Sequence, residues 1–201
     1  MELIPVDYTN YRCAIEIQKK IFPHEDGTLN ILASLGRDLF LKRTGLSYED
    51  DHVKYFIAYD NDETVGITGI YYYENIDPKS AWLAWFGVLP NKRRRHYGEQ
   101  ILQQTMWMAR QEGFETMRLY TDAVGNATAI KLYEKMGFVG EKYSAEQLSY
   151  DCRIYSKSLN NKKVDLWNNK MLGFSHQSEL EQIPEERMAE ILNMYENHDN
   201  N

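Results

Sequence analysis

The chain has few cysteines, and they are arranged neither as a disulfide framework nor as a metal site. Cys13 and Cys152 are its two cysteines in 201 residues, without a CxxC motif or a cysteine–histidine cluster. This usage excludes a disulfide-dense scaffold and a cysteine-rich zinc site. A chain of this length buries roughly 70% of its unfolded surface, so it folds without such supports. We expect reduced thiols, a cytoplasmic location and no metal.

Long apolar segments and an excess of positive charge are also missing. The longest near-continuous apolar run, Ala81 to Leu89, is far too short to cross a bilayer, and the first residues lack the basic region of a signal peptide. We therefore expect no membrane association. The net charge of −7 disfavours nucleic acid as a partner. It leaves open whether the chain binds a cationic substrate or is simply well solvated.

The periodicity of the apolar residues predicts an α/β fold. Runs rich in β-branched and aromatic residues predict strands over residues 2–7, 53–59, 64–73, 81–89, 117–121, 138–143 and 148–156. Helical spacing predicts helices over residues 10–20, 29–42, 98–112 and 127–136. Together they predict a single domain with a central mixed sheet of about seven strands and helices on both faces. The run from Ala81 is apolar on both sides, as in a central, doubly covered strand.

A polar stretch after Leu159 suggests a boundary between a domain over residues 1–159 and a C-terminal extension over residues 160–201. The extension contains an amphipathic helix over about 184–196, with Pro184 at a favourable first position. Its apolar stripe must be buried, and comprises Met188, Ile191, Leu192 and Tyr195. Three ways of burying the stripe remain open: the helix packs on the chain's own domain, contacts a second copy in a homodimer, or lies over the substrate cleft.

The segment after the run from Ala81 combines the features of an anion site. Pro90 ends the strand, a basic run from Lys92 to Arg95 follows, and a helix begins near Tyr97 or Gly98. The first N–H groups of a helix lack intrahelical partners and, with the helix dipole, can hold a pyrophosphate. A solvated basic loop is an equally good explanation of these residues alone, and a nucleic-acid patch a weaker one.

Two spaced motifs extend this interpretation. The first has Val88, Pro90, Arg93 and Gly98 at the spacing Val-x-Pro-x-x-Arg-x-x-Gly-x-Gly, and the second has Asn126, Ala129, Tyr133, Gly137 and Phe138. With these motifs the sequence resembles the GNAT superfamily of N-acetyltransferases over residues 2–158. One position departs: His96 replaces the first glycine of the loop. Histidine tolerates positive φ better than most residues, so we expect strain or a slightly altered loop there.

The resemblance implies acetyl-CoA as co-substrate and assigns residues to it. The residues expected to bind it are Phe86, Val88, Arg93, Arg94, Arg95, His96, Tyr97, Gly98, Asn126 and Tyr133. Asn126 is also expected to cap the helix that starts at Ala127. Tyr133 is the expected proton donor to the leaving thiolate, although its helical spacing also suits a core aromatic.

The general base is less clear from the sequence. An alkyl amine of pKa about 10.4 is mostly protonated at pH 7, which costs roughly 4–5 kcal/mol of reactive fraction. The run from Ala81 to Phe86 contains no carboxylate, which leaves Glu74 and Asp122 at the ends of neighbouring strands. Each is also an ordinary solvated acid at a strand end. A base acting through water, or a less basic amine, remains open.

The acceptor side is suggested by a group of aromatic residues. The group consists of Tyr71, Tyr72, Tyr73, Trp82, Trp85 and Tyr120. Together with Glu74, Asp122 and the acids from Glu49 to Asp51, these side chains would suit a small cationic amine. The alternative is that the aromatic residues belong to the hydrophobic core. We expect an N-acetyltransferase that acts by direct attack in a ternary complex. The alternative is a non-catalytic acyl-CoA-binding sensor or partner-docking module.

Overall fold

The computed structural model describes residues 1–46, 52–122, 125–143, 152–168 and 183–196. Its strands are β1 (Glu2–Pro5), β2 (His52–Asp60), β3 (Glu63–Tyr72), β4 (Ser80–Val88), β5 (Thr116–Asp122), β6 (Val139–Tyr143) and β7 (Cys152–Ser158). Its α-helices are α1 (Tyr11–Ile21), α2 (Thr28–Ser34), α3 (Arg37–Thr44), α4 (Tyr97–Gln111), α5 (Ala127–Lys135) and α6 (Glu185–Glu196).

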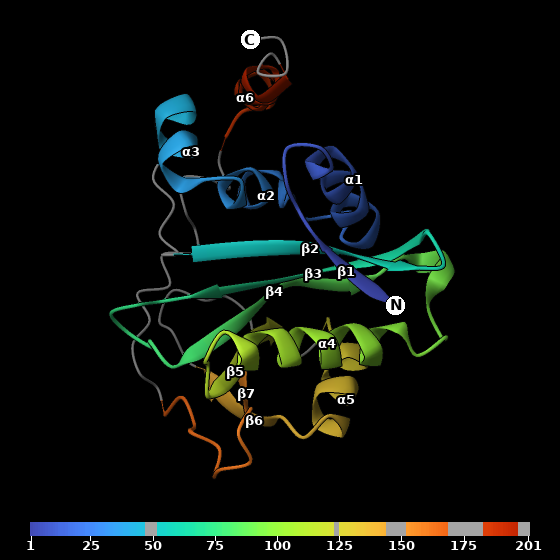
Figure 1. Ribbon diagram of the computed structural model, residues 1–201, viewed down its shortest axis with the longest axis vertical. Coiled ribbons are helices and arrows are strands. Elements are labelled where there is room, and N and C mark those ends of the chain that lie inside the picture. The colour runs from blue at the N-terminus through green and yellow to red at the C-terminus, as the bar shows by residue number, and fades with distance from the viewer. Residues whose placement is uncertain (47–51, 123–124, 144–151, 169–182, 197–201) are drawn as a thin grey trace.

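One seven-stranded sheet organises the chain in the order β1-β2-β3-β4-β5-β7-β6. Every neighbouring pair is antiparallel except β4 and β5, which are parallel. Figure 1 shows α1, α2, α3 and α6 over one face of the sheet and α4 and α5 over the other. The predicted mixed sheet with helices on both faces is therefore confirmed.

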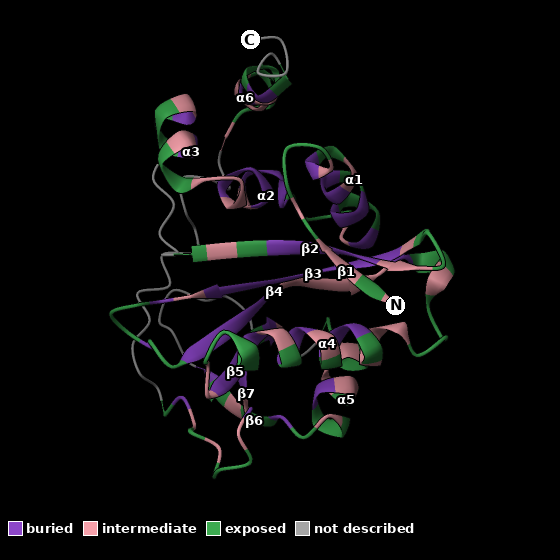
Figure 2. Cartoon of the chain, in the orientation of Figure 1, coloured by how far each residue is buried: buried purple, intermediate pink, exposed green. Residues whose placement is uncertain are grey.

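Each face of the sheet has its own hydrophobic core. On the α1 face, Ile17, Leu32 and Phe40 pack against Ile57 and Ile67 of the sheet. On the α4 face the main core is built by Leu102, Met106, Met117, Leu119, Tyr133 and Phe138. Figure 2 shows buried residues on the inner sides of the helices and along the sheet, with exposed residues on the outer turns. Apolar faces at helical and strand spacing produce this layering.

Two predicted elements differ from those observed. The single helix expected over residues 29–42 is broken into α2 and α3, because Gly36 adopts φ +149°, which no helix accommodates. The strand expected from residue 148 is described only from Cys152, and its first residues lie outside the described part. The strands predicted over residues 53–59 and 64–73 pair as the β2–β3 hairpin, and its turn residues Asn61 and Asp62 have φ +50° and +65°.

The extension beyond residue 159 packs back against the rest of the chain where it is described. Ile191 and Tyr195 of α6 are buried against the core on the α1 face, and Arg187 donates a hydrogen bond to the Thr44 carbonyl at 3.0 Å. Trp167 packs edge-on against Trp82 at a ring distance of 5.4 Å. The chain's own domain thus covers the stripe of α6. No helix within the described residues is long and apolar enough to span a membrane.

Candidate functional site

The site begins where the two parallel strands part. β4 and β5 pair only at three positions, from Ser80 with Thr116 to Trp82 with Arg118. The first four residues of β4 are buried, whereas residues 84–88 are half-buried although the strand is central in the sheet. The expectation of a doubly covered strand therefore holds for its first half only. Its second half borders a fork that opens toward the carboxyl ends of β4 and β5.

A β-bulge lies inside this fork. Ile67 pairs with Gly87 and Gly69 with Ala84, so that one residue of β3 faces two of β4. Trp85, in the bulge, has φ +38°, an unusual value for an aromatic residue. A bulge interrupts the ladder and leaves the extra residue unpaired. Backbone polar groups at this level of β4 can therefore face a ligand in the fork.

The loop after β4 delivers its backbone toward the same opening. Pro90–Lys92 forms a single 3₁₀ turn, Arg94 has φ +63°, and His96 has φ +61° and ψ +10° at the N-cap of α4. The expected left-handed geometry at His96 is thus present with histidine in place of glycine. The His96 side chain makes no capping hydrogen bond to this end of α4. Its first N–H groups, and the concave loop before them, suit an anion.

Some basic residues of the loop are bound to other groups of the protein, and others are not. Lys92 forms an ion pair with Glu63 of the β2–β3 hairpin, and Arg93 Nε donates to the Val88 carbonyl at 3.2 Å. Arg94 and Arg95 are exposed and have no hydrogen bond or ion pair with the residues that the structure describes. These two guanidinium groups are therefore the ones available to phosphates.

Tyr97 and Gly98 open α4 in different ways. The Tyr97 hydroxyl donates to Asp60 Oδ2 at 2.8 Å, and this hydrogen bond raises the pKa of the phenol. The Tyr97 side chain thus anchors the loop to the β2–β3 hairpin and leaves its backbone for the ligand. A Cβ at Gly98 would lie 3.4 Å from Leu132 and 3.7 Å from Val88, which are ordinary contacts. The protein's own packing therefore does not require a glycine there.

Tyr133 lies on α5 and faces β4. Its ring is 6.1 Å from the ring of Phe86, and only 6% of the residue is exposed. Burial raises the pKa of the phenol, so it stays protonated at neutral pH. The hydroxyl has no hydrogen-bond partner in the described parts of the chain. A protonated phenol that faces the fork with a free O–H can serve as a proton donor.

Asn126 occupies the N-cap position of α5, as predicted, but its side chain makes no capping hydrogen bond. Its backbone has φ −113° and ψ +30°, which is not the extended geometry of most caps. The prediction that the Asn126 side chain caps α5 is therefore wrong. The exposed amide remains available to a ligand.

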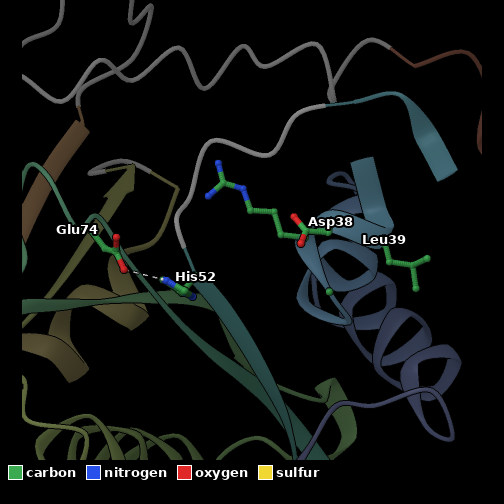
Figure 3. Close-up of a pocket in the computed structure, with 6 residues that line it drawn as sticks. Asp38, Leu39, His52 and Glu74 are labelled. Atoms are coloured by element: carbon green, nitrogen blue, oxygen red, sulfur yellow. Dashed lines mark hydrogen bonds and ion pairs between the residues drawn. The ribbon is translucent and has the colours of Figure 1, made fainter. Parts of the chain in front are cut away.

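The two carboxylates expected as general base lie at opposite ends of the sheet. Asp122 ends β5 beside the fork and accepts a hydrogen bond from the Gly125 N–H at 3.1 Å. Glu74 follows β3 at its far end; β3 runs from Gly66, the partner of Val88, to Tyr72, about 20 Å at 3.3 Å per residue. Glu74 pairs there with His52 at 3.0 Å, beside a hollow rimmed by Asp38 and Leu39 of α3 (Figure 3).

The aromatic group expected to line an acceptor cleft is divided among several surroundings. Tyr71, Tyr73 and Trp82 are buried in a core cluster with Trp167, and Trp82 donates its indole N–H to Asp77 at 3.2 Å. Tyr120 is 39% exposed, and Tyr72 packs against Phe114. Only Trp85 lies at the bulge. The acids from Glu49 to Asp51 lie outside the described residues.

Sequence patterns missed one part of the site, the loop from Phe22 to Gly27. It lies between the helices predicted over residues 10–20 and 29–42, and Phe22 packs edge-on against Trp85 at a ring distance of 5.1 Å. Its one local signal is a pair of acids, Glu25 and Asp26, shortly after the end of α1. Such a pair is common in solvated turns. The contact with β4 could not be predicted without the tertiary structure.

Comparison with known proteins identifies the architecture. The model of the acetyltransferase (GNAT) family matches residues 15–138, which is more than half of the chain. The chain belongs to this family. The match covers the fork, the loop and α5 with Tyr133, so the interpretation of the two motifs as those of a GNAT acetyltransferase is confirmed. No curated protein matches the sequence.

Solved structures share the fold of this GNAT chain at low identity. The ribosomal-protein-S18-alanine N-acetyltransferase from Escherichia coli is 17% identical, with a TM-score of 0.58 over 83% of this chain and 98% of its own. The spermidine N-acetyltransferase from Vibrio cholerae in complex with CoA and spermine is 16% identical, with a TM-score of 0.58 over 79% and 95%. Within the described residues, no three His, Cys, Asp or Glu side chains gather as a metal site.

Proposed function

We propose that this chain transfers the acetyl group of acetyl-CoA to a primary amine by direct attack in a ternary complex. The observation that carries the proposal is the convergence of three features on one half of β4. The strand is half-buried there, the uncapped start of α4 follows it, and the Tyr133 ring lies beside Phe86. No single one of these features needs a thioester substrate, but together they suit one.

The cofactor-binding groups follow from this geometry. The pyrophosphate would lie on the first N–H groups of α4, where a helix N-terminus favours anions. Arg94 and Arg95 would reach the phosphates, since Lys92 and Arg93 are engaged within the protein. The pantetheine arm would run along Phe86 and Val88 into the fork, beside Asn126. The sulfur would then lie within reach of the Tyr133 hydroxyl.

The acceptor is proposed to be a small cationic amine. The net charge of −7 favours a cation, and Asp122 places a carboxylate beside the fork. The structural neighbours named above act on an alanine residue of a ribosomal protein and on spermidine, so the shared fold accepts amines of different size. Asp122 would attract the acceptor's charge. Glu74, at the far end of β3, is the weaker candidate for a base.

Calorimetric titration with acetyl-CoA tests the cofactor site. We expect saturable binding at one site per chain. The Arg94→Gln and Arg95→Gln variants test the two free cations, with dephospho-CoA as the matched ligand. If one of these arginines contacts the 3′-phosphate, its substitution should weaken acetyl-CoA binding by roughly tenfold, as expected for loss of one exposed charge-assisted hydrogen bond. The same substitution should leave the affinity for dephospho-CoA unchanged, because that ligand lacks the 3′-phosphate. If acetyl-CoA does not bind, the proposed function is wrong.

A further inference from the structure

The two faces of β4 at the bulge belong to different parts of the molecule. Phe86 lies on the α4 side, where its ring is 6.1 Å from that of Tyr133. Trp85 lies on the α1 side, where its indole N–H donates to Asn30 Oδ1 at 3.2 Å. The proposed cofactor path occupies the side of Phe86 and Val88. An amine must therefore approach the thioester from the Trp85 side.

The loop from Phe22 to Gly27 covers that side of the bulge. A Cβ at Gly87 would lie 2.4 Å from Ile21 Cγ2, so the end of α1 packs directly on the β4 backbone. A Cβ at Gly27 would lie 2.9 Å from the Trp85 indole, so the other end of the loop packs on the bulge residue. Both ends of the loop are therefore in contact with β4. Glu25 lies between them.

The backbone at Glu25 is held in place from within the protein. Gln18 is fully buried and donates through Nε2 to the Glu25 carbonyl at 3.2 Å. The Glu25 N–H donates to the Phe22 carbonyl at 3.1 Å. A fixed backbone limits where the Glu25 side chain can reach. Such support is what a residue that positions a reactant needs.

The carboxylates of the two acids in this loop differ in their interactions with the rest of the protein. Asp26 accepts a hydrogen bond from the Thr28 N–H at 2.9 Å and pairs with Lys19 at 3.5 Å. The Glu25 carboxylate has no hydrogen bond or ion pair with any residue described. The residue is exposed to solvent, yet the protein atoms around the carboxylate desolvate it and raise its pKa, while the charge of the neighbouring His24 acts in the opposite direction. A carboxylate with a raised pKa is a better proton acceptor than an ordinary one.

We propose that Glu25 binds the ammonium group of a cationic acceptor and takes its proton. The inference rests on the proposed acetyl transfer and names the acceptor class, a protonated primary amine. The proton moves from the nitrogen to the carboxylate, and the freed lone pair attacks the thioester carbonyl carbon. The C–S bond then breaks, and the sulfur takes a proton from the Tyr133 hydroxyl. The second proton of the nitrogen returns to Tyr133 through water, and Glu25 releases its proton to solvent.

The test compares Glu25→Gln with the wild type on two kinds of nucleophile. The cationic probe is the best wild-type acceptor among spermidine, cadaverine and an alanyl peptide, and the neutral probe is hydroxylamine, which is already unprotonated at pH 7. We expect kcat/KM for the cationic probe to fall about 100-fold, the low end for loss of a general base. We expect hydroxylamine turnover and acetyl-CoA affinity to stay within about threefold, a small free-energy change.

The pH profile separates proton transfer from a structural effect. For the wild type, activity with the cationic probe should fall as the pH drops through the raised pKa of Glu25, because a protonated carboxyl cannot accept a proton. The variant should lack this limb. Glu16→Gln is the matched control, since Glu16 lies exposed on α1, where its ion-pair partner among the described residues is Lys20, one turn away.

Three results would overturn the inference. They are an unchanged rate with the cationic probe, an equal loss with both nucleophiles, and a wild-type pH profile in the variant. Each leaves the proposed acetyl transfer intact, because the wild type still binds acetyl-CoA and acetylates amines. Failure of the wild type to bind acetyl-CoA is distinct, and removes the proposed function together with this inference.

Discussion

At the scale of single residues, Tyr133 combines two properties that the sequence presented as alternatives. Its helical spacing suited a core aromatic, whereas the resemblance to the GNAT family implied a proton donor. The ring is buried with Phe86, Phe138 and Tyr155, while the hydroxyl has no partner in the described chain. One residue can fill both roles, because the ring and the hydroxyl of a tyrosine have different environments.

Tyr133→Phe removes the hydroxyl and keeps the ring. We expect kcat to fall about 100-fold, since general acid catalysis contributes 10²–10⁴-fold, with little change in acetyl-CoA affinity. Steady-state kinetics and calorimetry on the same preparation measure both quantities. Tyr155→Phe is a suitable control, because its hydroxyl instead contacts Glu134 at 3.3 Å. Equal turnover of Tyr133→Phe and the wild type would remove Tyr133 from the mechanism.

Gly98→Ala tests whether a ligand, not the protein, requires a glycine at the start of α4. The added methyl group meets Leu132 at 3.4 Å and Val88 at 3.7 Å, so folding should tolerate it. We expect unfolding free energy to be unchanged or to rise by up to about 1 kcal/mol, because alanine favours a helix over glycine. Acetyl-CoA affinity should fall about tenfold as the methyl group keeps phosphate from the backbone. A loss of stability in Gly98→Ala would show that the fold itself, and not the ligand, requires a glycine at this position.

At the scale of elements, a helix can be predicted more readily than its place. The amphipathic stripe of α6 was evident from spacing, but its cover was not. The structure packs Ile191 and Tyr195 against the core on the α1 face, with Arg43 stacked 4.4 Å from the Tyr195 ring centre. The sequence did not determine the position of α6, because an apolar stripe shows that a helix face is buried but does not show which surface buries it.

Ile191→Ala tests the docking of α6. Ile191 is fully buried, so the substitution should lower the unfolding free energy by about 2–5 kcal/mol through lost burial and a residual cavity. Met194→Ala on the same helix is the control, because Met194 is 38% exposed and should change stability by no more than about 0.5 kcal/mol. Urea unfolding measures both variants. Equal effects would show that α6 does not contribute to the core in solution.

The predicted helix over residues 29–42 illustrates a limit of periodicity. Apolar spacing continues through this range, but Gly36 turns the chain between α2 and α3 with φ +149°. A glycine costs only about 1 kcal/mol within a helix, so its presence does not by itself show where a helix ends. Tertiary contacts decide that. By contrast, Gly45 does end a helix: it is the C-cap of α3, where it has φ +72°.

At the scale of the whole molecule, a buried ion-pair network joins segments distant in sequence. Arg118 of β5 is fully buried and contacts Asp77 Oδ2 at 2.7 Å, Ser156 Oγ at 2.7 Å and Asp165 Oδ2 at 2.8 Å. Arg118 and Trp82 are also the last pair before β4 and β5 part. The network therefore connects the closed end of the fork to the segment after β7.

Arg118→Met should lower the unfolding free energy by about 3–5 kcal/mol, because it leaves Asp77 buried without its cation. Lys79→Met is the control: Lys79 pairs with Glu115 at the surface, where such pairs contribute about 1 kcal/mol or less. Urea unfolding distinguishes the two. If Arg118→Met costs no more than Lys79→Met, the network does not stabilise the fork.

The sequence by itself determined the α/β class, the family and the position of the basic loop between β4 and α4, because these depend on periodicity and on motifs within short segments. Even the left-handed geometry at His96 could be expected from its position in the motif. Only the tertiary structure decided where β4 and β5 part, which cations of the loop are free, and that the loop from Phe22 to Gly27 packs at the bulge whereas Glu74 follows the far end of β3. These features depend on pairings between distant residues, and the local sequence carries no record of its partners.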